Sequence, residues 1–458
     1  MRKRLLTLAG FMMMVSASLT AQVDSTGPLK MAYSGFTRTG FYGNLKSGSG
    51  PFVSSTFSDF GFKGEGDDGA HFKAYADLRF RYGTEFREQV SAFSIREAYI
   101  NISGKKWALD AGQQILKWGR ADFTNPTSRF SPVNYISRSS DQEDMDLGNL
   151  LLRWRLYPSR YFTLEAVAAP LYRSSVLLTS PLELPSYVKL DGIDSLVSGH
   201  DAFSYGLKGD LHFGEIDMSL SWFDGFNPMP GIALTAFNLD MSGPVPVPYT
   251  RLSARQYRIR NIGFDFETAL GNSTIRGEAA YTIPDRSYKI YEYIPMKELN
   301  WVLGYDRTFG DWRITGEYSG KFIPGFTGTT VDPIFGQETD ISKLISLMSA
   351  PGFDLREYTR QEVGSFNRLC NYQLRRAYHS LTMRVEADLF YSRLNMSLMT
   401  RYNIVSRDLL LMPELSYKPS DGLTIKAGAD FYSGTKGSVY DIIDDFMNCI
   451  KIGVRVDF

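Results

Sequence analysis

The amino-acid sequence predicts an all-β fold, a transmembrane up-and-down antiparallel β-barrel of about 18 strands, with 16 as the alternative count. Segments of about ten residues in which apolar and polar residues alternate recur along the chain. The links between them are alternately short and long, as short periplasmic turns and long extracellular loops require. After residue 21 no continuous apolar run reaches the roughly 20 residues that a membrane-spanning helix needs, so only strands could cross a bilayer.

The first 21 residues have the layout of a secretory signal peptide. Arg2, Lys3 and Arg4 precede an apolar run, and small residues precede Gln22. We expect cleavage after Ala21, so that residues 22–458 form a single barrel domain in the cell outer membrane.

The alternation that predicts strands is clearest in residues 71–83, HFKAYADLRFRYG. Phe72, Leu78 and Phe80 fall on one face, whereas Lys73 and Asp77 fall on the other. The same period recurs in residues 203–213, 381–389 and 423–431, and a first strand is expected near residues 30–42. Helical spacing would mix these charges into the apolar stripe, so strands are the better interpretation.

Turn residues order the strands into hairpins. Tight links rich in Gly, Pro, Asp and Asn are expected at residues 66–69, 104–106, 158–160, 214–215, 271–272, 310–311, 391–393 and 419–422. Longer links stand between them at residues 119–145, 171–201, 227–255 and 322–375. The last of these contains a candidate helix at residues 340–350, which could lie over the barrel mouth or pack on its outer rim.

The chain ends in CIKIGVRVDF, which alternates strictly and finishes on Phe. This strand resembles the terminal signal that the barrel-assembly machinery recognises in Gram-negative outer-membrane barrels, and the resemblance implies that machinery as a partner. The residues that carry the signal are Ile450, Ile452, Val454, Val456 and Phe458. Residues 112–135 are similar to a porin-like family of unknown function from the same membrane, through Gly112, Gln114, Trp118 and Gly119.

A barrel of about 16 to 18 strands is wide enough for an aqueous lumen, whose wall would carry the polar faces of the strands. Both signs of charge occur there, and structural ion pairs and pore-lining charges look alike in a sequence. The residues expected to line the pore are Lys73, Asp77, Arg79, Arg81, Glu97, Arg153, Arg155, Lys208, Asp210, Arg276, Glu278, Glu317, Arg384, Glu386, Asp388, Lys426, Asp430, Lys451 and Arg455.

The link 119–145 is the candidate constriction loop, because it carries enough charge to face an opposing wall across water. Its charged residues are Arg120, Asp122, Arg129, Arg138, Asp141, Glu143 and Asp144. Arg79 and Arg153 are expected at different heights, so the arginines do not predict a single basic ring or an ion preference.

Aromatic residues and cysteines add little chemistry. Most tryptophans suit interfacial girdles: Trp107, Trp154, Trp222, Trp301 and Trp312. Tyr75 and Tyr99 could form a sugar-stacking step, although wall packing is the commoner role of such a pair. Cys370 and Cys449 are too few for a disulfide framework and have no metal-like spacing.

The favoured function is passive diffusion of small hydrophilic solutes through a channel in outer-membrane lipid, by a monomer or a homo-oligomer. Lys plus Arg equal Asp plus Glu at 50 each, so net charge gives no sign of nucleic-acid binding. No motif for a cofactor, a metal or a phosphate appears, and His379 beside Ser380 would point to the opposite face of a strand, so catalysis is not expected. A partner-gated export channel for lipid or polysaccharide and, less favoured, a barrel-embedded hydrolase remain alternatives.

Overall fold

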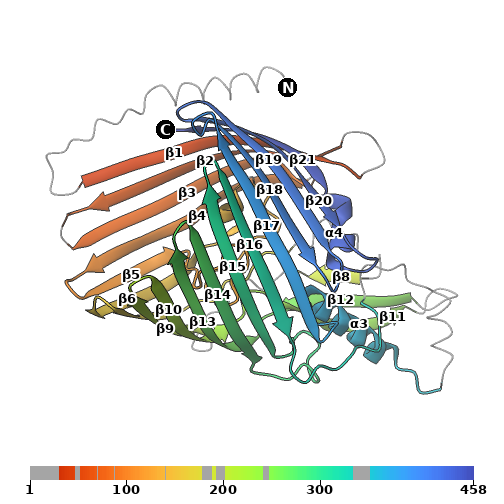
Figure 1. Cartoon of the computed structure of the whole chain (residues 1–458). Helices are drawn as coiled ribbons and strands as arrows, with labels where there is room; N and C mark the ends of the chain where they lie inside the picture. Colours follow the sequence, from red (N-terminus) through yellow and green to blue (C-terminus); the bar gives the residue numbers. More distant parts are fainter. Residues whose placement is uncertain are drawn as a thin grey trace.

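The computed structural model describes residues 30–46, 52–69, 71–86, 88–139, 141–177, 188–191, 202–240, 247–333 and 351–458. In this part of the chain, 18 strands form one antiparallel sheet that closes into a barrel (Figure 1). The strands are β1 (Lys30–Asn44), β2 (Phe52–Asp67), β3 (Phe72–Glu85), β4 (Glu88–Ser103), β5 (Trp107–Gln114), β6 (Asn149–Ser159), β7 (Phe162–Ala169), β9 (Ser204–Phe213), β10 (Ile216–Phe226), β13 (Arg258–Leu270), β14 (Ser273–Pro284), β15 (Glu298–Phe309), β16 (Trp312–Phe322), β17 (Ala377–Leu389), β18 (Leu394–Asn403), β19 (Leu409–Ser420), β20 (Leu423–Ser433) and β21 (Cys449–Asp457).

The last strand closes the barrel against the first. β21 pairs antiparallel with β1, from Phe36 opposite Asp457 to Asn44 opposite Cys449. The backbone N–H of Phe458 then donates to the carbonyl of Gly35 at 2.9 Å. The predicted fold class, the strand count of 18 and the closing role of the C-terminal strand are confirmed.

Alternating residues give each strand an apolar outer face. Large apolar side chains such as Phe93, Leu220 and Leu303 are exposed on the outside, as a lipid-facing wall requires. Trp107, Trp154, Trp222 and Trp312 are exposed as well. The tight links form hairpins: Gly271 has a φ of +60° between the paired residues Leu270 and Ser273, a conformation that glycine adopts without steric cost.

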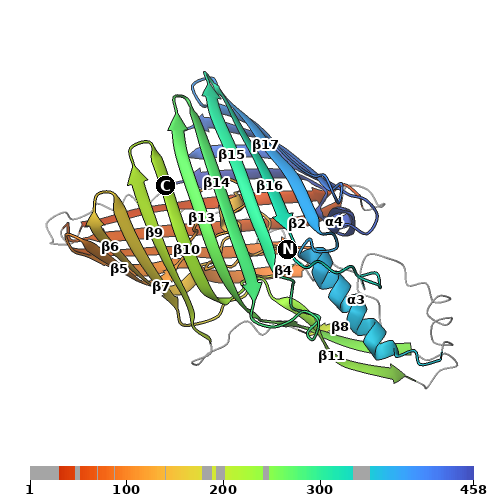
Figure 2. The ribbon, with the colours of Figure 1, turned by 60° about the horizontal axis from the view of Figure 1, so that its bottom comes forward.

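The long links carry structure of their own at the opposite end of the barrel from these hairpins (Figure 2). A small sheet joins β8 (Val188–Asp191), β12 (Val247–Arg255) and β11 (Gly231–Asp240), and the helix α3 (Leu355–Cys370) packs on it through Val363. A second helix, α4 (Val439–Met447), lies between β20 and β21. The sequence analysis anticipated neither helix.

Two expectations lie outside the described residues, namely the signal peptide and the helix at residues 340–350. Among the described residues, no helix has the length and apolarity needed to cross a membrane. Cys370 and Cys449 are both free thiols.

Candidate functional site

The β5–β6 loop, residues 115–148, folds into the barrel and packs on the inner wall. Trp118 and Phe130 are buried and form a T-shaped pair with ring centroids 5.1 Å apart. Phe130 makes a second T-shaped contact with Phe223 of β10, at 5.0 Å. The indole Nε1 of Trp118 donates to Glu165 of β7 at 2.7 Å, so the apolar packing also satisfies the ring N–H. This cluster fixes one side of the loop against β6, β7 and β10.

The first part of the loop is held by carboxylates of the wall. Glu278 of β14 accepts hydrogen bonds from the backbone N–H groups of Arg120 and Ala121 at 2.5 and 2.7 Å. Its other oxygen accepts from the hydroxyl of Thr127 at 3.1 Å. Glu317 of β16 accepts from the backbone N–H of Phe123 at 3.0 Å. These carboxylates therefore satisfy loop amides that would otherwise be buried without a partner.

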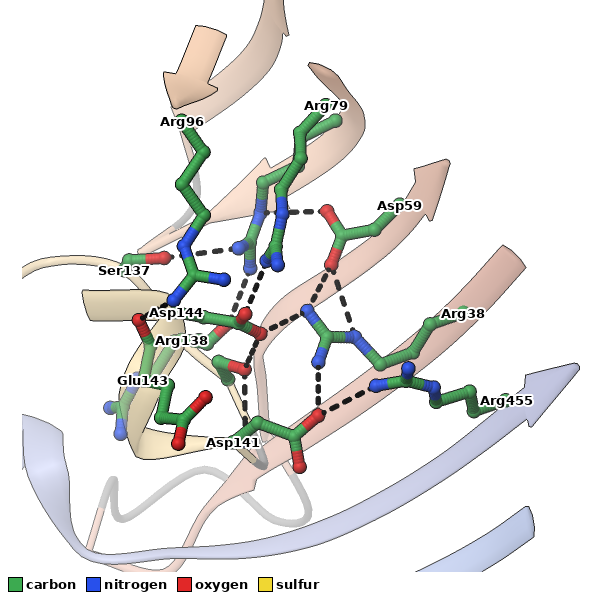
Figure 3. Close-up of polar contacts among 12 residues, drawn as sticks. Arg38, Asp59, Arg79, Arg96, Ser137, Arg138, Asp141, Glu143, Asp144 and Arg455 are labelled. Carbon is green, nitrogen blue, oxygen red and sulfur yellow. Dashed lines mark hydrogen bonds and ion pairs between the residues drawn. The ribbon is translucent and has the colours of Figure 1, made fainter. Parts of the chain in front are cut away.

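The last part of the loop carries two carboxylates into a group of basic residues on the opposite wall (Figure 3). Asp144 pairs with Arg38 of β1 at 2.7 Å and also with Arg79 of β3. Asp141 pairs with Arg38 at 3.0 Å, with Lys426 of β20 at 2.6 Å and with Arg455 of β21 at 3.1 Å. Both ends of the loop are thus fixed. The loop spans the lumen between the acidic wall, where the carboxylates of Glu278 and Glu317 hold its first part, and the basic wall, where Arg38, Arg79, Lys426 and Arg455 hold its last part.

The basic wall changes the acidity of both loop carboxylates. Burial opposes ionisation of Asp144, but the guanidinium groups of Arg38 and Arg79 outweigh burial and hold its pKa well below the ordinary value. The pKa of Asp141 is lowered in the same way, because Lys426 and Arg38 outweigh its burial. Both carboxylates therefore remain charged over the whole neutral range and keep the loop attached.

Most of the residues expected to line the pore make contacts on the inner side of the wall. Some contact the β5–β6 loop directly: Arg79, Arg81, Glu97, Asp210, Arg276, Glu278, Glu317, Arg384, Lys426 and Arg455. Others pair with a neighbouring strand or turn: Lys73 with Asp67, Asp77 with Arg96, Arg153 with Glu165, Arg155 with Asp110, Lys208 with Asp210, Asp388 with Asn395, and Lys451 with Asp430. Glu386 stands opposite Arg313 in the register of β16 and β17.

The charged residues of the loop have different environments. Arg120 binds Asp265 of β13 at 2.8 Å and Asp122 binds Arg276 of β14 at 2.6 Å, so both attach the loop to the side of the wall that carries Glu278. Arg138 instead points its guanidinium at the carbonyl of Phe446, at 2.8 Å. Glu143 contributes its backbone carbonyl, which accepts from Arg96 at 2.8 Å.

Sequence reasoning missed Arg38, the centre of the basic wall. It shares the inner face of β1 with the buried aromatic residues Phe36 and Tyr42, so that face appears apolar in the sequence. The Phe36 ring lies 5.5 Å from the Arg38 guanidinium and 4.3 Å from that of Arg455. A basic residue within an inward aromatic stripe is the signal that could have identified it.

A cavity of about 330 Å³ remains between the loop and the inner wall of β15–β18. Thr124, Asn125 and Arg129 contribute from the loop, and Arg401 contributes from β18. Tyr75 and Tyr99 lie elsewhere, as a cross-strand pair with ring centroids 5.4 Å apart.

No family model matches the chain, and no curated protein matches it either. Solved structures do match. OccAB3 of Acinetobacter baumannii has a TM-score of 0.52 at 10% identity, over 93% of this chain and 99% of that one. OccAB1 of the same organism gives 0.51 at 10% identity, over 96% and 99%. OccK3 (OpdO) of Pseudomonas aeruginosa gives 0.51 at 10% identity, over 93% and 95%. At this identity the likeness establishes the fold alone, a closed antiparallel β-barrel.

Proposed function

We propose that the chain is an outer-membrane channel for passive diffusion of small hydrophilic solutes, and that the β5–β6 loop is its constriction. The observation that carries the proposal is the loop itself, which crosses the lumen and is held at both walls, by Glu278 on one side and by Arg38 on the other. A loop fixed in this way narrows a wide barrel without depending on a moving part.

The same proposal gives the inner charges a role. Residues on the inner face that also contact the loop, such as Arg79 and Arg276, would border the remaining aqueous path and influence which ions pass. We place the barrel in the outer membrane, with lipid against its apolar face and the assembly machinery acting on the C-terminal strand. Residues 1–21 would direct export as a signal peptide. The experiments below also test whether the barrel works as a monomer or as a homo-oligomer.

The test is to refold residues 22–458 in detergent and to record single-channel currents in a planar bilayer under a salt gradient. Stable open steps with a measurable reversal potential are expected. A barrel that is folded by circular dichroism yet silent would contradict passive diffusion and favour a gated exporter. Chemical crosslinking of the refolded protein, before it is inserted into the bilayer, would report the oligomeric state.

No described contact favours a hydrolase. The ring of His379 stacks on Tyr318, with its Nδ1 2.7 Å from the tyrosine hydroxyl, whereas Ser380 borders the inner cavity. The two side chains therefore lie on opposite faces of β17 and do not form a nucleophile–base pair.

A further inference from the structure

The cavity beside the β5–β6 loop lies between the loop, the inner wall and the outer mouth of the barrel. Asn125 and Arg129 form its loop side, and Asn300 and Ser380 belong to the wall. Tyr372, which follows α3, and Tyr440 of α4 border it from the outer side. A volume of about 330 Å³ is at the small end of ligand sites and suits a molecule the size of one sugar ring.

Two guanidinium groups border this cavity, those of Arg129 and Arg401. In the described part of the chain, neither Arg129 nor Arg401 lies within ion-pair distance of an acid, whereas Arg38, Arg120 and Arg276 are all paired. Arg129 has one side-chain hydrogen bond, to Thr282 at 3.3 Å, and its Nε is buried without a partner. Burial lowers the pKa of Arg129. An unpaired buried cation is costly, so an anion that binds there would be stabilised.

Arg401 adds a second cation at the same cavity. Its Nε donates to the hydroxyl of Thr382 at 3.1 Å, and an Nη donates to that of Thr124 at 3.3 Å. These two partners are neutral, as is the hydroxyl of Tyr440, which also bonds Arg401. Glu317 of β16 interacts with Arg401 electrostatically, from beyond ion-pair distance.

Two acids, Glu298 and Asp408, line the cavity. Glu298 pairs with Lys321 at 2.8 Å and accepts from Gln373 at 2.8 Å. Asp408 is buried, which raises its pKa, and one of its oxygens accepts from Ser406 at 2.7 Å. Three cations, Arg129, Lys321 and Arg401, therefore line the cavity against these two acids, which leaves a formal surplus of one positive charge.

Tyr372 has a backbone conformation that favours glycine, and its side chain borders the cavity. Its φ is +52°, and it stands just after the C-cap of α3, where glycine is the usual residue. The backbone N–H of Tyr372 donates to the carbonyl of Leu369 at 3.0 Å, and the backbone N–H of Gln373 donates to the carbonyl of Arg368 at 2.7 Å. These are the two hydrogen bonds of a Schellman motif. A tyrosine is strained in this conformation, and the cavity gives its ring a role that glycine could not supply.

We propose that this cavity binds an acidic monosaccharide. Arg129 and Arg401 would pair with its anionic group, and Tyr372, Tyr378 and Tyr440 would contact its ring. Much of the remaining lining consists of amides and hydroxyls, including Asn125, Asn300, Asn403, Ser319 and Ser380, which suit sugar hydroxyls better than an apolar body. The inference deepens the proposed channel function, because it names a solute class that would pause at the constriction.

The test is isothermal titration of the refolded barrel in detergent with glucuronate, glucose 6-phosphate, glucose and benzoate. Binding of glucuronate or glucose 6-phosphate, with glucose at least tenfold weaker, is expected. If glucuronate binds more tightly, the anionic group is a carboxylate; if glucose 6-phosphate binds more tightly, it is a phosphate. Equal binding of glucose would overturn the anionic part of the proposal, and tighter binding of benzoate would overturn the sugar part.

Variants locate the site. Arg401→Gln should weaken the preferred sugar about tenfold or more, because a charge-assisted contact is lost. Tyr372→Gly removes the ring but gives the helix cap its usual residue, so this variant should fold normally and still bind several-fold more weakly. Arg160→Gln, at an exposed residue of the β6–β7 turn, is the matched control and should change nothing. Unchanged affinity in both cavity variants would overturn the site.

Titration does not depend on conduction, so the two proposals can fail separately. A barrel that conducts but binds none of the four probes would overturn the sugar site and leave the channel intact. A silent barrel that binds the acidic sugar would overturn passive diffusion and leave the site intact.

Discussion

Gly119 shows how one residue determines the path of the β5–β6 loop. Its φ is +95°, and a Cβ atom there would lie 2.3 Å from Oε1 of Glu278. That oxygen accepts the backbone N–H groups of Arg120 and Ala121, so the carboxylate cannot withdraw without losing both bonds. Glycine is therefore required both for the backbone conformation and for the close approach of the loop to the wall.

Gly119→Ala should detach the first part of the loop, at a cost of at least about 2 kcal/mol from the strained φ and the steric overlap. Cleavage by trypsin after Lys117 and Arg120, read by mass spectrometry of the folded barrel, measures the detachment. Gly316→Ala is the matched control, because a Cβ there meets no atom within 4 Å. Equal protection of the two variants from trypsin would show that the carboxylate of Glu278 can move aside.

The two carboxylates at the other end of the loop make its attachment depend on pH. The pKa of Asp141 and of Asp144 is lower in the folded barrel than in the unfolded chain. The stability they contribute is therefore fully present above the unfolded pKa, about 4, and is lost as pH falls through the folded value. The two loop carboxylates therefore determine the direction of the pH dependence.

We expect single-channel currents to be quiet from pH 7 to about 4 and to become noisy, with larger open steps, below that range. Asp144→Asn should produce the same noise at pH 7, because it removes the charge paired with Arg38 and Arg79 at a cost of about 3 kcal/mol. Asp445→Asn, at an exposed residue outside the loop, serves as control. A quiet Asp144→Asn channel at pH 7 would mean that Asp141 alone holds the loop.

At the scale of elements, the barrel strands were predictable and the outer helices were not. Strands such as β3 and β21 alternate between apolar and charged residues because lipid and water meet them on opposite sides. α3 buries Leu355, Thr359, Val363 and Asn367, a stripe in which two of the four residues are polar, and it lies within a long link that the sequence analysis assigned to a loop. The attachment of the loop was unpredictable for another reason: its partners are up to 314 residues away, as for Asp141 and Arg455.

Asn367 joins α3 to two other segments at the barrel mouth. Its Oδ1 accepts from the N–H of Ile232 at 2.8 Å, and its Nδ2 donates to the carbonyls of Ile232 and Glu292 at 2.7 and 3.0 Å. Asn367→Ala would leave these buried groups unpaired, at about 1 to 3 kcal/mol. Faster hydrogen exchange in α3 and β11, with β15–β18 unchanged, is expected by mass spectrometry. Arg356→Ala, on the exposed side of α3, should leave exchange unchanged.

For the whole molecule, the closed ladder of 18 strands and the loop inside it make separate contributions. Backbone hydrogen bonds run around the complete circumference, and the ladder that closes β21 on β1 is made by the backbone groups of these two strands. The wall can therefore stand without the loop, although the apolar cluster would lose Leu116, Trp118 and Phe130, three of its ten buried residues. The width of the aqueous path, by contrast, depends on the loop, because an empty barrel of this strand number is several times wider than a solute.

Replacing residues 119–145 with a short Gly-Ser linker should leave a folded barrel of lower stability whose single-channel conductance is several-fold higher. Circular dichroism and heat-dependent gel migration check the fold, and planar-bilayer recording measures the conductance. A linker of the same composition in place of residues 227–255, whose described part lies at the outer mouth, is the control and should change conductance much less. If both deletions raise conductance equally, the narrowest point lies at the mouth, and Arg38 and Glu278 then hold a loop that stabilises the wall without setting the pore.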